Sequence, residues 1–258
     1  MSGVAMNGKH IVVTGAGTGI GRAIARRLGR DGASVTLLAR DRDRLEAVAA
    51  AMEGPTHVAA CDIRERGKVE KAFAGAVDHL GPIHALVACS GIGGPNGGEP
   101  DADRFDEIVA TNLNGTYYCC RAAHERLAPG PEARHLILIS SILARIAVPK
   151  YTGYSASKAG LLGLVRSFGA ELGEDNIQVN AICPGWVDTD MAWDGLDAIA
   201  GETGGTRESA YRDAMGAVPL GRMSLPEDIA GTVAWLLSPD ARGVTGQAID
   251  QNGSAWVG

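Results

Sequence analysis

The 258-residue sequence predicts an α/β protein with one doubly wound parallel sheet of about seven strands and helices on both of its faces. Short aliphatic runs alternate six times with amphipathic stretches of helix length between residues 10 and 182. The runs are apolar at successive positions, which is typical of parallel strands that helices cover on both sides. No linker or shift in composition divides the chain, so we expect a single domain over residues 1–258.

Each element follows from one of these stretches. The aliphatic runs predict strands over His10–Thr14, Ser34–Ala39, Thr56–Ala60, Ile83–Cys89, His135–Ser140, Ile177–Ile182 and, as the last strand, Gln247–Asp250. The amphipathic stretches predict helices over Gly19–Arg30, Arg42–Met52, Glu65–Leu80, Arg104–Leu127, Ser155–Leu172 and Pro226–Leu237. Proline is favoured in the first turn of a helix, which supports the start at Pro226.

The alternation stops after Ile182, and a long segment without it follows. Long irregular connections in compact domains are usually functional, so we expect a substrate lid over about residues 188–218. Its apolar side chains either line a pocket or pack the lid onto the body of the protein: Met191, Trp193, Leu196, Ile199, Tyr211 and Met215.

Composition excludes several classes of protein. Hydrophobic residues make up 45% of the chain and aromatic residues only 5%, so the core must be mostly aliphatic. The net charge of −6 argues against a nucleic-acid partner. Five cysteines, an odd number without a CxxC pair, favour reduced thiols over disulfides or zinc, and the six histidines show no metal-ligand spacing. No signal peptide or membrane-spanning run is present, so we expect a soluble, cytoplasmic protein.

A glycine-rich segment joins the first strand to the first helix. Glycines let the backbone turn sharply and approach a pyrophosphate, which then meets the positive end of the helix. An ordinary strand-to-helix turn is the alternative, but this position favours a dinucleotide site. The candidate residues are Gly15, Gly17, Thr18, Gly19, Ile20 and Gly21.

The TGxxxGxG spacing resembles the short-chain dehydrogenase/reductase family, which has a Rossmann-like sheet. In that family an acid at the end of the second strand selects NAD, and here the position is Ala39. Arg40 follows it, and a guanidinium pairs well with a 2′-phosphate, so the resemblance favours NADP(H) over NAD(H). Asp41, 20 residues after Gly21, keeps NAD(H) open, and Thr18 stands where many NADP-using relatives carry a basic residue.

Three further segments match the family's cofactor site. Asp62 and Ile63 resemble the adenine-contacting turn, although Asp62 is also a residue that starts helices. Gly91 alone matches the usual Asn-Asn-Ala-Gly, and Cys89 in that segment is interpreted as an inert thiol. A PGxxxT segment would hold the nicotinamide carboxamide and pyrophosphate through Pro184, Gly185, Val187 and Thr189.

The catalytic signature is Tyr154 with Lys158 four residues later, on one helical face. A nearby cation favours tyrosinate, so Lys158 is expected to lower the pKa of Tyr154 and make it a general acid or base. The resemblance adds Ser141, 13 residues before Tyr154, as the donor to the substrate oxygen, with Ser140 pointing to the other face. It also adds Asn112, which would hold a water on a relay to Lys158.

The resemblance implies an enzyme that interconverts a ketone and a secondary alcohol. Hydride would pass between the nicotinamide and the carbonyl carbon while Tyr154 moves the proton, Ser141 stabilises the oxyanion and Lys158 binds the nicotinamide ribose. A non-catalytic cofactor-binding regulator or scaffold is the alternative, and a lyase or epimerase of the extended branch is a weaker one. The intact set of four residues speaks against the regulator.

The closest resemblance is to ketoreductases of β-ketoacyl and polyketide type. Relatives that act on carrier proteins have basic residues just before the fifth and sixth strands, whereas this chain has Glu132 and Asp175, with Arg134 nearby. Like charges oppose docking of an acidic carrier. We therefore expect a free ketone or alcohol, or a coenzyme A thioester, as substrate. The resemblance also implies a homotetramer, in which Trp256 reaches a neighbouring subunit.

Overall fold

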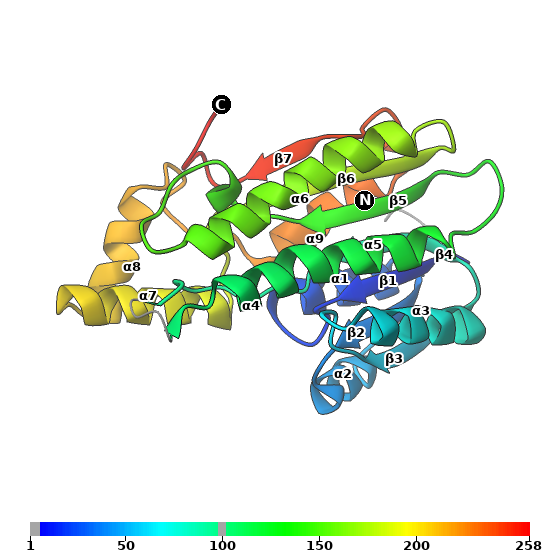
Figure 1. Ribbon diagram of the computed structural model, residues 1–258, viewed down its shortest axis with the longest axis horizontal. Coiled ribbons are helices and arrows are strands. Elements are labelled where there is room, and N and C mark those ends of the chain that lie inside the picture. Colours follow the sequence, from blue (N-terminus) through cyan, green and yellow to red (C-terminus); the bar gives the residue numbers. More distant parts are fainter. Residues whose placement is uncertain (1–5, 98–101) are drawn as a thin grey trace.

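The computed structural model describes residues 6–97 and 102–258. Seven strands form one sheet in the order β3-β2-β1-β4-β5-β6-β7, and every neighbouring pair is parallel (Figure 1). This confirms the predicted α/β, Rossmann-like class. The strands are β1 (His10–Thr14), β2 (Ser34–Ala39), β3 (Thr56–Ala60), β4 (Ile83–Ala88), β5 (Arg134–Ile139), β6 (Ile177–Pro184) and β7 (Ala248–Gln251).

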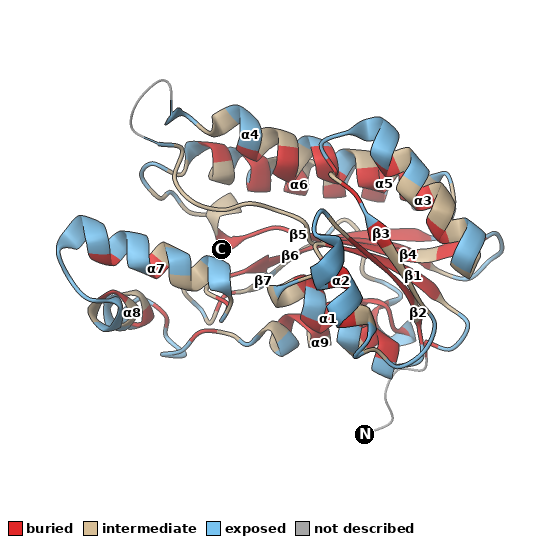
Figure 2. Cartoon of the chain, turned by 90° about the horizontal axis from the view of Figure 1, so that it is seen from below, coloured by how far each residue is buried: buried red, intermediate tan, exposed pale blue. Residues whose placement is uncertain are grey.

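Helices cover both faces of the sheet and turn their buried sides toward it (Figure 2). One layer holds α1 (Gly19–Arg30), α2 (Arg42–Ala49) and α9 (Pro226–Leu236). The other layer holds α3 (Arg66–Leu80), α4 (Phe105–Val109), α5 (Thr116–His124) and α6 (Thr152–Glu171). Two buried clusters, one on each side of the sheet, form the core, and both are mostly aliphatic as the composition predicts.

The long helix predicted over Arg104–Leu127 is helical without a break over residues 105–124, but it is not a regular α-helix throughout. Between α4 and α5 the chain makes a π-helical turn over Ala110–Gly115. Asn112, in this turn, is fully buried and binds the loop after β4. The wider turn is the kind of local irregularity that often marks a functional position.

The segment expected to be irregular also differs, because most of it is helical. Helices α7 (Asp190–Thr203) and α8 (Arg207–Gly216) lie beyond the carboxyl ends of the strands (Figure 1). Thr189 and Thr206 cap them, each accepting a backbone N–H from the first turn. The two helices have a small core of their own, which includes Leu196 and Met215.

Four histidines form a row at the opposite, amino end of the sheet. His10 is the first residue of β1, and His57, His84 and His135 are second in their strands. The ring of His10 bonds the Gly81 carbonyl at 2.7 Å through Nδ1 and the Thr36 hydroxyl at 2.8 Å through Nε2. Burial lowers the pKa of all four histidines, and that of His135 to about 4.

Candidate active site

The candidate site residues gather where β1, β4, β5 and β6 end, at one edge of the sheet. Thr14, the last residue of β1, ties two of these ends together. Its Oγ1 accepts hydrogen bonds from the backbone N–H groups of Cys89 and Ser90, each at 3.0 Å. Parallel sheets bind ligands at this edge, so the arrangement fits a cofactor site.

The glycines of the first loop are required by close packing. Gly15 has φ +67°, and a Cβ on it would lie 3.0 Å from the Cys89 carbonyl carbon. A Cβ on Gly21 would lie 2.2 Å from the Gly15 carbonyl oxygen. A Cβ on Gly19 would lie 3.0 Å from Cγ2 of Thr189. The loop is therefore compact, and it contacts the PGxxxT segment.

The amino end of α1 offers free donors to a phosphate group. Thr18 is its N-cap, yet its exposed side chain makes no capping hydrogen bond. The first turn, which starts with Gly19 and Ile20, contains no acidic residue. Unpaired N–H groups and the positive end of a helix dipole suit a pyrophosphate, so the loop fits a dinucleotide.

The end of β2 supports the interpretation of Arg40. The strand ends at Ala39, as expected, and Arg40 is exposed directly after it. The Asp41 carboxylate already has partners within α2. As the N-cap of that helix it accepts the Arg44 N–H at 3.1 Å, and it forms an ion pair with the Arg44 guanidinium at 3.1 Å. Gly17 in the glycine loop lies beside Arg44, since a Cβ on it would be 3.4 Å from Cβ of Arg44.

The turn after β3 corrects one alternative. Asp62 does not start α3, which begins at Arg66 with Glu65 as its N-cap. Its carboxylate is held by the Arg64 guanidinium at 2.6 Å, and this hydrogen bond is the main reason why the pKa of Asp62 is lowered. The Ile63 side chain is buried against Gly115, where a Cβ would lie 2.7 Å from its Cγ1.

Tyr154 and Lys158 lie on α6, one turn apart, beside the end of β5. Lys158 is 5% exposed, and its Nζ donates to the Ile139 carbonyl at 2.9 Å. Nζ also lies 5.6 Å from the centre of the Tyr154 ring. A Cβ on Gly91 would lie 3.4 Å from this nitrogen, so the loop after β4 borders the same site.

The expected effect of Lys158 on Tyr154 is not what the structure shows. Burial raises the pKa of Tyr154, and the neighbour that opposes the rise is the Ser141 hydroxyl, through a hydrogen bond. Lys158 is itself desolvated, which lowers its own pKa to about 8. Tyr154 is therefore a neutral phenol at neutral pH in this structure.

The side chains of the two serines after β5 have different partners, as predicted. The Ser140 hydroxyl donates to the Lys158 carbonyl at 2.9 Å and belongs to the packing of α6. Ser141 caps a 3-10 turn over Ile142–Ala144, and its Oγ accepts the Leu143 N–H at 3.1 Å. That bond leaves the hydroxyl proton of Ser141 free to point toward Tyr154 or a substrate oxygen.

Asn112 connects the π-helical turn to the site. Its side chain accepts the Ile92 N–H at 2.8 Å and donates to the Ile92 carbonyl at 3.0 Å and to Ser157 Oγ at 3.1 Å. Ser157 in turn donates to the Tyr154 carbonyl at 2.8 Å. Asn112 thus links the loop after β4 to the helix that carries Tyr154. Ser157 was not among the residues predicted from the sequence, although its place on the helix, three residues after Tyr154, was a usable signal.

Cys89 and the PGxxxT segment complete the surroundings. Burial raises the pKa of Cys89 to about 12, which agrees with an inert thiol.

The PGxxxT segment follows β6, which ends at Pro184. Gly185 packs against Asn252, because a Cβ on Gly185 would lie 3.0 Å from Cα of Asn252. Val187 is buried and pairs with Ser224. The Thr189 hydroxyl, besides capping α7, donates to the Val187 carbonyl at 3.2 Å.

The apolar residues of the lid fall into two groups. Leu196 and Met215 are buried in the lid's own core, which also includes the partly buried Trp193 and Tyr211. Met191 is 48% exposed, and its sulfur would lie 3.0 Å from a Cβ on Gly93 in the loop after β4. Met191 therefore lies at the mouth of the site, whereas the core residues support the lid.

Known proteins resemble the chain over nearly its whole length. The family described as Enoyl-(Acyl carrier protein) reductase matches residues 15–253. A 3-oxoacyl-[acyl-carrier-protein] reductase MabA of Mycobacterium bovis is 30% identical over 257 residues, which cover 97% of this chain and 94% of the relative. An L-rhamnose 1-dehydrogenase (NAD(P)(+)) of Azotobacter vinelandii is 36% identical over 259 residues, 96% of this chain and 97% of the relative.

A solved structure agrees with these relatives. A variant of an actinorhodin polyketide ketoreductase with NADPH superimposes with a TM-score of 0.86 at 31% identity, covering 96% of this chain and 97% of the other. Sequence and structure thus point to the same group of enzymes, which act on CH–OH and C=O groups. The chain belongs to the short-chain dehydrogenase/reductase family, as a ketoreductase-like oxidoreductase that uses a nicotinamide cofactor.

Proposed function

We propose that this protein interconverts a free ketone and a secondary alcohol, with Tyr154 as the group that gives and takes the proton. The observation that carries the proposal is the meeting of Tyr154, Ser141 and Lys158 at the end of β5, beside the glycine loop. A non-catalytic regulator would need the cofactor loop but not this set of polar side chains around a half-buried phenol.

The residues have separate roles in this reaction. A bound nicotinamide supplies the hydride for reduction and accepts it in oxidation. Ser141 donates a hydrogen bond to the substrate oxygen and stabilises the charge that develops there. Tyr154 carries the proton for that oxygen, and its raised pKa keeps the proton in place at neutral pH. Lys158 donates one proton to the Ile139 carbonyl, and its remaining protons would hold the ribose hydroxyls of the nicotinamide.

The raised pKa of Tyr154 makes the two directions differ in their pH dependence. Reduction needs the phenol, which is present below its pKa, so the reduction rate should be flat through pH 7 and fall at high pH. Oxidation needs the phenolate, so its rate should rise with pH over the same range. Rate profiles in both directions, with the cofactor saturating, measure this.

We propose NADP(H) as the preferred cofactor, with NAD(H) as the alternative. Arg40 is exposed at the end of β2, and among the described residues it has no ion-pair partner, whereas Arg42 and Arg44 pair with Glu46 and Asp41. A free guanidinium at this place suits a 2′-phosphate. Arg40→Ala should raise KM for NADPH by about tenfold and leave KM for NADH unchanged. Arg42→Ala is the matched control, and an equal effect on both cofactors would contradict the assignment.

The surface supports a freely diffusing substrate, a ketone, alcohol or coenzyme A thioester, rather than a carrier protein. The Glu132 side chain is 72% exposed, and Arg134 is only 8% exposed because its guanidinium donates to the backbone carbonyls of Gly130, Glu132 and Asp175. Arg134 is therefore withdrawn from the surface. If kcat/KM for an acyl-carrier substrate is higher by orders of magnitude than kcat/KM for its small thioester analogue, this part of the proposal is wrong.

The deciding experiment follows cofactor absorbance at 340 nm with a panel of ketones, ketoacyl thioesters and secondary alcohols. The proposed reaction is supported if the wild type is active and the Tyr154→Phe variant is slower by at least about a hundredfold. Tight cofactor binding without turnover on any substrate would favour the non-catalytic alternative. Thermal melting of Tyr154→Phe shows whether the variant is folded.

A further inference from the structure

Ser141 lies at one end of a short turn whose other end is Arg145. The 3-10 turn Ile142–Ala144 starts with the Ser141 cap and closes with the Arg145 N–H, which donates to the Ile142 carbonyl at 2.8 Å. A turn this short has few internal hydrogen bonds, so its placement depends on its surroundings. The Ser141 cap and β5 hold its start, Ile142 is buried and α6 packs against the turn, and the Arg145 side chain ties its end to a distant part of the protein.

That side chain reaches the C-terminal part of the protein. Nε and Nη2 of Arg145 donate to the Asp250 carboxylate at 3.3 and 3.4 Å, and Nη2 also donates to the Ala248 carbonyl at 3.4 Å. Both charged side chains are 25% exposed, which reduces solvent screening. Asp250 and Ala248 belong to β7, the edge strand that pairs with β6.

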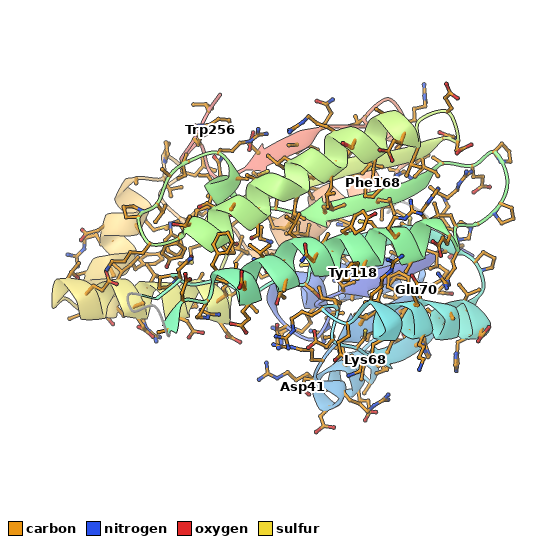
Figure 3. All side chains as sticks on the ribbon, in the orientation of Figure 1. Asp41, Lys68, Glu70, Tyr118, Phe168 and Trp256 are labelled. Carbon is orange, nitrogen blue, oxygen red and sulfur yellow. The ribbon has the colours of Figure 1, made fainter. Side chains whose placement is uncertain are left out.

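Trp256 covers the same guanidinium. The central carbon of the Arg145 guanidinium lies 5.2 Å from the centre of the Trp256 ring, a cation–π distance. Trp256 is held by Asn252, whose side chain donates to the Trp256 carbonyl at 3.1 Å and accepts its N–H at 3.4 Å. Figure 3 labels Trp256 near the C-terminal end, beyond β7. Arg145 thus bonds the strand on one side and contacts the ring on another.

We propose that Arg145 is a positioning residue, which holds Ser141 in its productive place by anchoring the turn to β7 and Trp256. This rests on the proposed function, because Ser141 is there the donor to the substrate oxygen. Small displacements of such a donor are costly, since the hydrogen bond must fit the oxygen as charge develops. The proposed role of Arg145 acts through Ser141 and requires no contact of Arg145 with substrate or cofactor.

A double-mutant cycle on kcat tests the proposal. Arg145→Ala should lower kcat by about tenfold or more, with KM for the cofactor unchanged. In the Ser141→Ala background the same substitution should lower kcat less than about twofold, because the donor it positions is already gone. Trp256→Phe retains a ring and should keep most of the activity, and Trp256→Ala should not.

The control is Arg27→Ala, which removes a partly buried Arg–Asp pair of α1 at 2.8 Å, with Asp31. It should cost similar thermal stability and leave kcat unchanged. If Arg145→Ala does not fold, Asp250→Asn weakens the same anchor with little change in shape. If Arg145→Ala lowers kcat equally in the wild-type and Ser141→Ala backgrounds, the positioning role of Arg145 is wrong. The proposed role of Ser141 is not affected by that result. If Ser141→Ala has normal kcat, both this inference and the proposed role of Ser141 are wrong.

Discussion

Among single residues, Lys158 is buried, and keeping its charged form out of water lowers the stability of the folded protein by an amount that depends on pH. Its pKa is about 8 in the folded protein and 10.5 in the unfolded chain, so the unfolded chain binds more protons between these values. The free energy of unfolding therefore rises with pH through this window. Lys158→Met should stabilise the protein at pH 7 by up to about 3 kcal/mol and abolish activity, with the gain gone near pH 10.5. Urea unfolding at both pH values measures it, and a gain independent of pH would point to packing instead.

Gly21 permits a second prediction at this scale. A Cβ at Gly21 would meet the Gly15 carbonyl oxygen at 2.2 Å, which the compact loop cannot absorb without shifting. Gly21→Ala should destabilise the protein by about 1–3 kcal/mol and weaken cofactor binding. Gly75→Ala on α3, where the new Cβ meets nothing within 4 Å, should instead stabilise by about 0.5–1 kcal/mol. Chemical unfolding and cofactor titration of both variants check this, and equal effects would refute the crowding argument.

The sequence predicts which residues approach one another in the site better than it predicts their electrostatics. Tyr154, Ser141, Lys158 and Asn112 come together as expected, because motif spacing and strand ends fix their positions. The direction of the Tyr154 pKa shift was wrong, since it depends on burial. The pairing of Asp62 with Arg64 was not foreseen either, because Asp62 was interpreted only as an adenine contact or as a residue that starts a helix. Asp41, on the loop after β2, is labelled in Figure 3.

At the scale of elements, the histidine row makes the amino ends of the strands sensitive to acid. The pKa of His135 is about 4 in the folded protein and 6.5 in the unfolded chain, so below pH 6.5 only the unfolded chain gains the proton. The stability that a neutral His135 contributes is full above pH 6.5 and is lost as pH falls, by about 3 kcal/mol in total. His10, His57 and His84 act in the same direction.

Measured unfolding free energies should therefore fall between pH 6.5 and pH 5, above the range in which most carboxylates titrate. His135→Gln should flatten this slope. His124→Gln on α5, which is not one of the four strand histidines, is the control and should leave the slope as in the wild type. A slope that His135→Gln does not change would mean that other groups cause the acid sensitivity.

Elements with a strong aliphatic or amphipathic period were predictable, and those set by local hydrogen bonds were not. The strand and helix order from β1 to β6 follows the sequence closely. The π-helical turn contains Asn112, whose bonds reach Ile92, 20 positions earlier in the chain, and the helical period does not indicate such a contact. The lid helices carry a weak apolar period, but their caps, Thr189 and Thr206, were readable signals that the sequence analysis did not use.

For the whole molecule, we predict the homotetramer that the family resemblance implies. Among the described residues, Tyr117 on α5 is 38% exposed and Trp235 on α9 is 40% exposed, which are large apolar side chains to leave in water. Sedimentation velocity should give four times the chain mass of 26.7 kDa. Tyr117→Glu should shift the distribution toward smaller species, and a monomeric wild type would contradict the prediction.

The sheet topology was predictable from the alternation of strands and helices, but the path of the C-terminus was not. Trp256 lies over Arg145 of its own chain, a contact that was not predicted, and its expected reach to a neighbouring subunit stays a prediction. Nothing in the spacing of two residues 111 positions apart indicates such a contact (256 − 145). Among the described residues no helix is long and apolar enough to cross a membrane.

The position of β7 makes one end of the proposed cofactor site depend on a strand that is remote from it in the sequence. Gly185, in the segment proposed to hold the nicotinamide, donates its N–H to the Gln251 carbonyl at 3.1 Å, and β7 pairs with β6 up to Pro184. A deletion of residues 248–251 would therefore retain every proposed site residue in the sequence and remove the strand that supports Gly185 from the side.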